Sequence, residues 1–491
     1  MSAKKKTSTK PPSGMRDFLP GDVARREHVI AVVREVYGRY GFVPLETPSI
    51  ESLETLLGKY GEEGDQLLYR LLHRRDALAR ALARDEVTEA DLADQGLRYD
   101  LTVPLARVVA QYDLPRFFKR YQIQPVWRAD RPGKGRFREF YQCDVDIVGT
   151  EAPIADAEVC AAPAEVLARL GFDDFTIRVN HRELLRAVIR ESDIDPALEG
   201  GALVAVDKLD KIGAGGVLQE LVERGVAEAS AHKLLSLACA EQLLEPGSPI
   251  YEVLDSKLAM NLGMQGVAAL YEHPDGGSKA LLAFYRRILK DERGLAVLDE
   301  LGALLELLAD TPAGPRAQFA PHLARGLSYY TGAIFEFAVP DYAGSIGGGG
   351  RYDNLIGIFG KDKVPAVGFA LGLERVLMLM EERGMFPPLT VGPEVLLCWR
   401  SVAPRDVLAC AHALRAQGLR VEVYPEPTKK LGKQVQYADA SGAGFAAILG
   451  EDELAAGAIT LKHLASGTQE RAPIDEAAAL VRRMATAKAG G

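Results

Sequence analysis

Apolar residues recur at helical spacing near the start of the chain, and prolines interrupt the pattern directly afterwards. Val29, Val36 and Tyr40 fall on one face of a helix that this spacing predicts over residues 21–40. The next segment, residues 42–51, contains two prolines, which exclude a helix and a central position in a sheet. We therefore expect an extended segment at the edge of a sheet or at an interface.

Three further stretches have distinct patterns. Residues 56–95 are charged and rich in alanine, which predicts a helical insertion. Residues 97–112 predict a strand that runs through Asp100 and Thr102 into a helix begun by the next proline. Residues 184–320 are rich in Leu, Ala and Glu and poor in β-branched runs, so we expect a mostly helical inserted domain.

Strand-like patterns return after the inserted domain. Residues 322–339 predict a strand that carries Arg325, Tyr329 and Tyr330. A buried strand with an arginine that reaches back to solvent would look the same. After Pro388 short apolar runs alternate with helical segments in the order β-α-β-α-β, which is typical of a small α/β domain of about 100 residues.

The segment from Phe118 to Gly149 predicts a β-hairpin with basic residues on both arms. The first arm ends in Arg128, and the turn carries Arg131, Lys134 and Arg136 among a proline and glycines. Guanidinium groups bind phosphate oxygens in pairs, so such a hairpin suits a polyphosphate on the sheet and a larger anion at the tip. An exposed hairpin with solvated charges is the alternative.

Two glycine-containing stretches follow. Gly347–Gly350 form a run that lets the backbone lie directly against a ligand, although a flexible turn is the alternative. Gly368 and Gly372 lie on a predicted strand that opens into a helix whose first turn holds Arg375. A guanidinium at that place could stack over a planar base, or it could be an ordinary surface charge.

Composition sets the broad class. The chain has 491 residues, of which 47% are hydrophobic, so we expect two or three globular domains. No apolar run is long enough to span a bilayer, and residues 1–12 predict a disordered basic tail. The five cysteines have no paired spacing, which argues against disulfides or a structural zinc site and favours a cytoplasmic protein. A net charge of −9 means that any nucleic acid must be bound by local basic patches.

The order of these segments resembles that of the class II aminoacyl-tRNA synthetases. Residues 42–51 look like motif 1, the hairpin is similar to motif 2, and GFALGLERV resembles motif 3. GMRDFLP, ARGLSYYTG and GGGGRYD resemble signatures of the histidine-specific members, whereas the class I signatures HIGH and KMSKS are absent. The similarity runs from Ser13 to the last predicted strand.

The resemblance implies an α+β fold with the antiparallel sheet of class II synthetases flanked by helices. The expected catalytic domain comprises residues 13–183 and 321–388, and the helical insertion comprises residues 184–320. Residues 392–491 would form an α/β anticodon-binding domain. Members of the family activate histidine with ATP and Mg²⁺, release pyrophosphate, transfer histidine to the 3′ end of tRNA(His), and form homodimers through motif 1.

The same resemblance implies a role for each matching residue. Arg128 and Arg325 would contact the α-phosphate and act in catalysis, Arg136 would reach the outer phosphates, and Phe140 and Arg375 would hold adenine. No residue is implied as a ligand of a structural metal.

The resemblance also implies which residues bind histidine and which contact tRNA. Asp100, Thr102 and Gln142 would hold the α-amino group, and Asp146 and Tyr330 the imidazole, with Arg325 and Tyr329 also in the histidine site. The candidate tRNA contacts are Arg116, Arg120, Arg131 and Lys134 for the acceptor stem, and Lys429, Lys430 and Lys433 in the anticodon-binding domain. A solvated helix start is the alternative for the three lysines.

The chain departs from the family pattern at one position, and two other functions are possible for a chain with this pattern. Ser328 stands where the family usually has Asp, which changes local hydrogen bonding. A synthetase-like regulatory subunit of ATP phosphoribosyltransferase shares the catalytic fold but usually lacks the C-terminal domain and several ATP residues. Arg128, Arg325 and Arg375 are all present here, which favours the enzyme. A pure RNA-binding module would not explain the glycine run.

Overall fold

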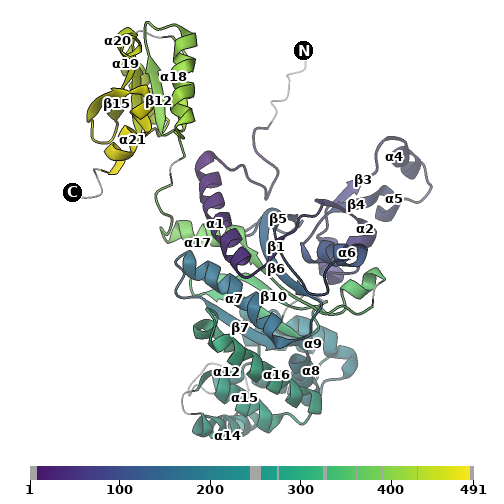
Figure 1. Cartoon of the computed structure of the whole chain (residues 1–491). Coiled ribbons are helices and arrows are strands. Elements are labelled where there is room, and N and C mark those ends of the chain that lie inside the picture. Colours follow the sequence, from purple (N-terminus) through teal and green to yellow (C-terminus); the bar gives the residue numbers. More distant parts are fainter. Residues whose placement is uncertain are drawn as a thin grey trace. The chain divides into compact units, whose positions relative to one another are not determined.

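The computed structural model describes most of the chain, which forms two compact units (Figure 1). One unit contains Arg26–Met385 together with the segment that ends at Asp17. The other contains Phe18–Arg25 and the chain from Phe386 onward. The described residues are 8–243, 256–273, 276–324, 329–360, 362–389, 391–427 and 430–486.

An eight-stranded sheet forms the centre of the first unit, in the order β1-β5-β6-β11-β10-β9-β7-β8 (Figure 1). The pairs from β5 to β7 are antiparallel, whereas the two edge pairs, β1 with β5 and β7 with β8, are parallel. The mainly antiparallel sheet expected from the sequence is confirmed. The strands are β1 (Val43–Pro44), β5 (Phe118–Trp127), β6 (Glu139–Val148), β7 (Thr176–His181), β8 (Ala317–Phe319), β9 (Ala333–Val339), β10 (Tyr342–Arg351) and β11 (Ala366–Gly372).

Long helices pack on this sheet. The helix expected over residues 21–40 is confirmed as α1 (Pro20–Arg39), and its Tyr37 hydroxyl donates to the carbonyl of Cys143 at 3.4 Å. Helix α7 (Pro153–Arg169) packs against β11 and β6. Because α7 is rich in alanine, its backbone approaches the sheet closely. Helix α17 (Leu373–Glu382) follows β11, as motif 3 predicts.

The expectation of a purely helical insertion over residues 56–95 is wrong. This stretch also contains strands, which pair with the end of the motif 1 segment in a separate three-stranded sheet of order β2-β4-β3. Motif 1 is therefore divided between the edge of the central sheet and this small sheet. The elements are β2 (Ile50–Ser52), α2 (Leu53–Leu56), α3 (Gly61–Gln66), β3 (Arg70–Leu72), α4 (Arg75–Leu82), α5 (Glu89–Leu92) and β4 (Ala93–Leu97).

The strand expected through Asp100 and Thr102 ends earlier than the sequence predicts. Strand β4 stops at Leu97, and helix α6 (Thr102–Gln111) begins at Thr102 rather than at the following proline. The Asp100 Oδ1 atom accepts a hydrogen bond from the backbone N–H of Val103 at 3.0 Å. This bond occupies a free donor in the first helical turn, so the chain leaves the strand before Asp100.

Tyr329 and Tyr330 also lie outside the strand on which the sequence placed them. Strand β9 begins at Ala333, and the two tyrosines precede it. The Thr331 N–H donates to the carbonyl of Arg351 at 2.8 Å and anchors the start of this strand beside β10. The tyrosine side chains therefore do not follow the alternation of a strand, and both reach the same cavity.

Residues 184–320 are mostly helical in the described part, as expected. Their last strand, β8, belongs to the central sheet, and α16 packs against α7, α8 and β7. The elements are α8 (Arg182–Glu191), η1 (Pro196–Leu198), α9 (Glu199–Val206), α10 (Leu209–Glu223), α11 (Glu228–Ala238), α12 (Ala240–Leu243), α14 (Ser256–Glu272), α15 (Gly277–Ile288), α16 (Glu292–Ala309) and η2 (Gly314–Arg316).

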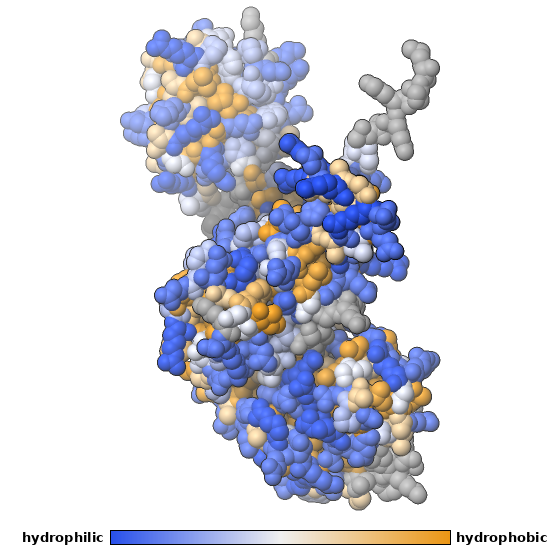
Figure 2. Space-filling view, turned by 90° about the vertical axis from the view of Figure 1, so that its right-hand side faces the viewer, coloured by the Kyte–Doolittle hydropathy of each residue, from blue (hydrophilic) through white to orange (hydrophobic). Residues whose placement is uncertain are grey.

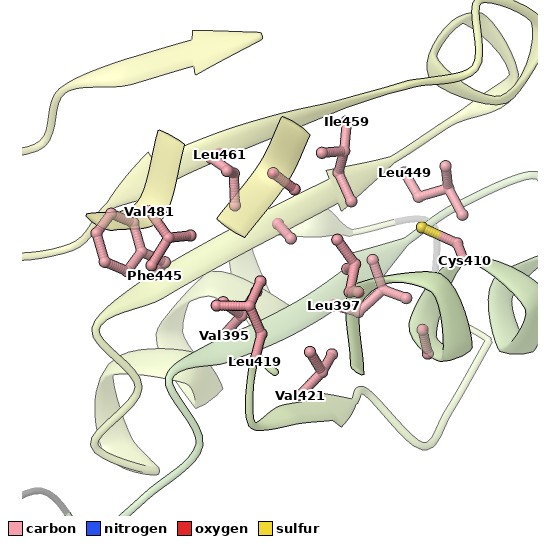
Figure 3. Close-up of a cluster of buried hydrophobic side chains, with 14 of the residues drawn as sticks. Val395, Leu397, Cys410, Leu419, Val421, Phe445, Leu449, Ile459, Leu461 and Val481 are labelled. Carbon is pink, nitrogen blue, oxygen red and sulfur yellow. The ribbon is translucent and has the colours of Figure 1, made fainter. Parts of the chain in front are cut away.

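The second unit contains a five-stranded sheet in the order β13-β12-β14-β15-β16. Strands β13, β12 and β14 are parallel and alternate with helices, which confirms the expected β-α-β-α-β order. Two antiparallel strands and a last helix, which the sequence pattern did not predict, complete the core around Val395, Leu397 and Val481 (Figure 3). The elements are β12 (Val395–Trp399), α18 (Pro404–Ala416), β13 (Val421–Val423), α19 (Leu431–Ala440), β14 (Phe445–Leu449), α20 (Glu451–Ala455), β15 (Ala458–His463), β16 (Gln469–Pro473), η4 (Ile474–Glu476) and α21 (Ala477–Thr486).

The molecular surface is predominantly hydrophilic on the face drawn in Figure 2, with apolar residues in small separate groups. Among the described residues, no helix combines the length and the hydropathy that crossing a bilayer requires.

A buried arginine ties the small sheet to the end of β5. Arg98 has no exposed surface, and its guanidinium donates to the carbonyls of Thr47 at 2.6 Å and Pro125 at 2.9 Å. It also donates to Gln124 Oε1 at 3.0 Å. Burial lowers the pKa of Arg98 to about 10. These bonds hold the backbone that leads into Tyr99 and Asp100, so Arg98 supports the wall of the cavity described below.

Replacing Arg98→Met should lower the free energy of unfolding by about 3 kcal/mol or more, because several buried acceptors would lose their donor. Urea titration followed by circular dichroism measures this loss. Arg80→Met is the matched control: Arg80 lies on α4 near the surface, where its Nε atom donates to the carbonyl of Asp76 at 3.3 Å. Equal free energies of unfolding for the two variants would show that the hydrogen bonds of Arg98 make no net contribution to stability.

Candidate active site

A cavity of about 810 Å³ lies in the first unit against the central sheet. Residues of the hairpin, of the segment before α6, of β10 and β11 and of the tyrosine segment line it together. Long stretches of sequence separate these parts, so only the fold brings them to one place. The predicted residues that line it are Asp100, Thr102, Arg128, Arg136, Phe140, Gln142, Asp146, Tyr329, Tyr330 and Arg375.

The hairpin supplies one wall through the alternation of β6. Phe140, Gln142, Asp144 and Asp146 occupy every second position and all line the cavity. Strand β5 pairs with β6 antiparallel over its whole length, with Trp127 opposite Glu139 at the end nearest the turn. The predicted motif 2 hairpin is therefore confirmed as a structural element, and its polar face is the inner one.

Arg128 is held between two aromatic rings. Its guanidinium carbon lies 4.2 Å from the ring centroid of Tyr99 and 5.2 Å from that of Phe140. Its Nε atom donates to the carbonyl of Tyr99 at 3.2 Å. The stacking fixes the plane of the guanidinium, so its terminal nitrogens are positioned to meet an anion in the cavity.

The N-terminal arm supports this hairpin from outside. The backbone N–H of Arg138 donates to the carbonyl of Gly14 at 2.8 Å, and the Arg16 guanidinium lies 3.6 Å from the ring centroid of Phe137. Gly14 and Arg16 of the GMRDFLP signature therefore brace the second arm of the hairpin. The sequence pattern identifies the signature but gives no indication of its position.

The glycine run forms the floor and is part of strand β10, so the alternative of a flexible turn is excluded. Side chains do not fit there: a Cβ atom on Gly349 would lie 2.0 Å from the carbonyl oxygen of Gly368. At the rim, Arg375 Nη1 donates to the carbonyl of Ser345, and Nε donates to that of Gly135 at 3.4 Å. These bonds fix Arg375 between the floor and the turn of the hairpin.

Asp100 is the centre of a buried cluster. Its Oδ1 accepts from the Tyr60 hydroxyl at 3.2 Å and from the Val103 N–H, and its Oδ2 accepts from the Tyr329 hydroxyl at 3.2 Å. Burial raises the pKa of Asp100, while Val103, the Arg128 charge and the two phenols oppose that rise. The sequence did not single out Tyr60, because nothing in its local pattern distinguishes it from a core aromatic.

Asp146 pairs with Arg120, which is fully buried, so the expectation that Arg120 contacts the tRNA acceptor stem is wrong. The Arg120 Nη2 atom lies 2.8 Å from Asp146 Oδ2, and neither side chain is more than 3% exposed. The Tyr352 hydroxyl also donates to Asp146 Oδ1. Gly368 is required opposite this carboxylate, since a Cβ there would lie 1.9 Å from Asp146 Oδ1. Burial raises the pKa of Asp146, and Arg120 and Tyr352 oppose the rise.

Asp144 and Glu374 are among the carboxylates that line the cavity without having been predicted as ligand contacts. Burial raises the pKa of Asp144 well above its ordinary value, and burial raises the pKa of Glu374 to about 7. Glu374 Oε2 accepts from the Tyr141 N–H at 2.9 Å. The alternation of β6, already visible as polar residues at every second position, could have identified Asp144.

The remaining predicted residues that the structure describes do not line the cavity. Arg131 and Lys134 lie in the turn of the hairpin, where Lys134 is exposed and pairs with Glu382 at 2.9 Å. Lys430 and Lys433 lie in the second unit at the start of α19. Arg325, Ser328 and Lys429 lie outside the described residues. Within the described part, no cluster of three or more His, Cys, Asp or Glu side chains could hold a metal ion.

Comparison with known proteins shows to which family the chain belongs. Residues 14–376 match the family model for histidyl-tRNA synthetase, and residues 402–484 match that of an anticodon binding domain. The chain belongs to the histidyl-tRNA synthetase family. The resemblance in motif order is thereby confirmed, and with it the class of aminoacyl-tRNA ligases.

Individual relatives extend over nearly the whole chain. The Histidine--tRNA ligase of Cytophaga hutchinsonii is 38% identical over 478 residues, which cover 95% of this chain and 97% of the relative. The Histidine--tRNA ligase of Gloeobacter violaceus is 39% identical, with the same shares covered. The crystal structure of histidyl-tRNA synthetase from Nostoc sp. PCC 7120 superposes with a TM-score of 0.72 at 28% identity, covering 98% of this chain and 100% of that chain. These relatives support the synthetase over the regulatory-subunit alternative.

Proposed function

We propose that this histidyl-tRNA synthetase family member is a histidine–tRNA ligase whose cavity joins histidine to ATP. The observation that carries the proposal is the composition of the cavity wall. Arg128, Arg136 and Arg375 supply cations for a triphosphate, and Asp100 and Asp146 supply acceptors for the N–H groups of histidine. The activated histidine is then transferred to the 3′ end of tRNA(His).

In the activation step the carboxylate of histidine attacks the α-phosphorus of ATP. The new O–P bond forms as the bond to pyrophosphate breaks, and no side chain acts as a nucleophile. Arg128 faces the cavity with its plane fixed, so it would stabilise the charge that develops on the α-phosphate. Arg325 is proposed as the second cation at the same phosphate, and this assignment rests on its sequence signature alone.

ATP would lie over the glycine floor, where the absence of side chains leaves space for a flat ligand. Phe140 and Arg375 would hold the adenine, and Arg136, which is half-exposed and lies 3.7 Å from Asp130, would reach the outer phosphates. Mg²⁺ would be held mainly by phosphate oxygens. Glu374 fits as a protein ligand, because its Oε1 is buried and accepts no hydrogen bond from the described residues.

Histidine would occupy the acidic part of the cavity. Asp100, Thr102 and Gln142 are proposed to hold its α-amino group, and Tyr329 orients Asp100 through the hydrogen bond between them. Asp146 and Tyr330 are proposed to recognise the imidazole, which offers one donor and one acceptor when neutral. The ion pair between Asp146 and Arg120 opposes the rise in the pKa of Asp146 that burial causes and so favours its charged form.

Transfer to tRNA would use basic residues outside the cavity. Arg131 and Lys134 lie in the turn of the hairpin and are proposed to meet the acceptor stem. Lys429, Lys430 and Lys433, in the anticodon-binding unit, are proposed to contact RNA phosphates. The five described cysteines are free and buried, which supports a reducing compartment, and we propose the cytoplasm.

Histidine-dependent exchange between ATP and pyrophosphate, measured with and without tRNA, tests the proposal. A ligase should exchange pyrophosphate without tRNA and should charge tRNA(His) when it is added. A regulatory subunit would do neither, and a pure RNA-binding protein would bind tRNA without exchange.

Assembly is a separate expectation. We propose a homodimer in which the motif 1 segment lies at the two-fold interface, because β1 is an edge strand with exposed Val43 and a proline. Light scattering at micromolar concentration should give twice the chain mass. Full activity from a protein that stays monomeric at that concentration would contradict the proposal.

A further inference from the structure

The cavity wall contains a carboxylate, Asp144, with an oxygen that no described protein group reaches with a hydrogen bond. Asp144 lies on β6 between Gln142 and Asp146 and is only 2% exposed. Its Oδ1 is buried and accepts no hydrogen bond from any residue that the structure describes. A buried carboxylate without a donor is destabilising, so the site is suited to a ligand that brings an N–H group.

Asp100 and Asp146, the two acidic residues proposed to bind histidine, already have partners. Asp100 accepts hydrogen bonds from Tyr60, Val103 and Tyr329. Asp146 pairs with Arg120 and accepts from a tyrosine hydroxyl. Asp146 Oδ2 also accepts no hydrogen bond from the described residues, but Arg120 Nη2 lies 2.8 Å from it as an ion-pair partner. Within the described part, Asp144 Oδ1 is the unpartnered carboxylate oxygen beside it, and all three residues line the same cavity.

The strand neighbours of Asp144 do not supply the missing donor. On β5 its partner in register is Gln122, whose amide nitrogen already donates to Thr47 Oγ1 at 2.9 Å and to Gln124 Oε1 at 2.6 Å. On the other side its partner in register is Ala370, whose small side chain leaves space beside the carboxylate. The free oxygen is therefore available to the contents of the cavity.

We propose that Asp144 accepts a hydrogen bond from the single N–H of the neutral imidazole and is a second specificity carboxylate, while Asp146, held by Arg120 and Tyr352, contacts the ring beside it. This inference rests on the proposed histidine activation. Asp144 and Asp146 lie two positions apart on one face of β6, so they face the same part of the cavity, whereas Asp100 lies at the start of α6. An apolar side chain of similar size would leave Asp144 unpaired and would be rejected for that reason.

Exchange kinetics of Asp144→Ala and Asp144→Asn test the assignment. In Asp144→Ala the KM for histidine should rise about 10- to 100-fold while the KM for ATP stays within about twofold. Asp144→Asn keeps a carbonyl acceptor of the same size, so its KM for histidine should lie between those of Asp144→Ala and wild type. Exchange by the wild-type protein tests the proposed function. The ratio of the KM for histidine in each variant to that of wild type tests the role of Asp144.

A control variant and a second ligand distinguish a contact with the imidazole from a structural role of Asp144. Asp156 is a buried carboxylate on α7 that pairs with Arg351 and does not line the cavity, so Asp156→Asn should lower the melting temperature without a histidine-specific change in KM. Imidazole-4-propionate, which lacks the α-ammonium group, is used as a competitive inhibitor. Its affinity should fall by the same factor as that of histidine in Asp144→Ala. Unchanged KM for histidine, a loss confined to histidine itself, or equal rises in both KM values would each overturn the inference.

Discussion

Replacing Arg128→Ala should reduce the rate of histidine-dependent exchange by about a hundredfold or more, because a cation aimed at the developing phosphate charge is lost. The guanidinium is held by the rings of Tyr99 and Phe140, so its direction is set before ATP binds. The loss should appear in kcat as well as in kcat/KM, since the interaction strengthens in the transition state. Single-turnover adenylate formation with saturating ATP and histidine is the decisive measurement.

Arg286→Ala provides the control for this loss. Arg286 lies on α15 outside the cavity and pairs with Asp299 on the surface, so exchange should be unchanged. Circular dichroism and thermal melting should show that both variants remain folded. Exchange by Arg128→Ala at the wild-type rate would remove Arg128 from the activation step.

Ending the chain after Pro388 should leave histidine-dependent exchange intact and reduce the charging of tRNA by about a hundredfold or more. The cavity is lined by residues from Tyr60 to Arg375, all of which this truncation retains. The removed part carries Lys430 and Lys433, and phosphate contacts of this kind dominate the affinity of proteins for nucleic acids. Exchange and charging should be measured on the same preparation.

A milder variant separates loss of RNA contacts from loss of structure. Lys430→Ala combined with Lys433→Ala leaves the second unit in place, and it should weaken charging in the same direction while its salt dependence becomes less steep. Unchanged charging by the truncated protein would show that the second unit has another role. Loss of exchange on truncation would show that it supports the catalytic unit.

The hairpin could be predicted from the sequence almost completely. Strands β5 and β6 are long, their alternation is regular, and the turn contains proline and glycine, so local preferences agree with the final structure. Motif 3 was equally clear, because the strand and helix around Arg375 are adjacent in sequence. Prediction failed where short strands depend on distant partners. Strands β3 and β4 lie in a charged segment and form only because β4 pairs with both β2 and β3.

The cavity likewise combines features that local sequence determines with features that depend on distant parts of the chain. Residue types and spacing were sufficient to identify the arginines of the hairpin, the motif 3 arginine and the polar face of β6 as parts of the site. The placement of these residues depends on chain geometry over only a few positions. Only the tertiary structure decided which side chains have partners. Arg120 reaches Asp146, Tyr60 and Tyr329 reach Asp100, and Asp144 Oδ1 accepts from none of the described residues. Such pairings depend on distances between segments far apart in sequence, and burial then makes each pairing, or its absence, energetically important.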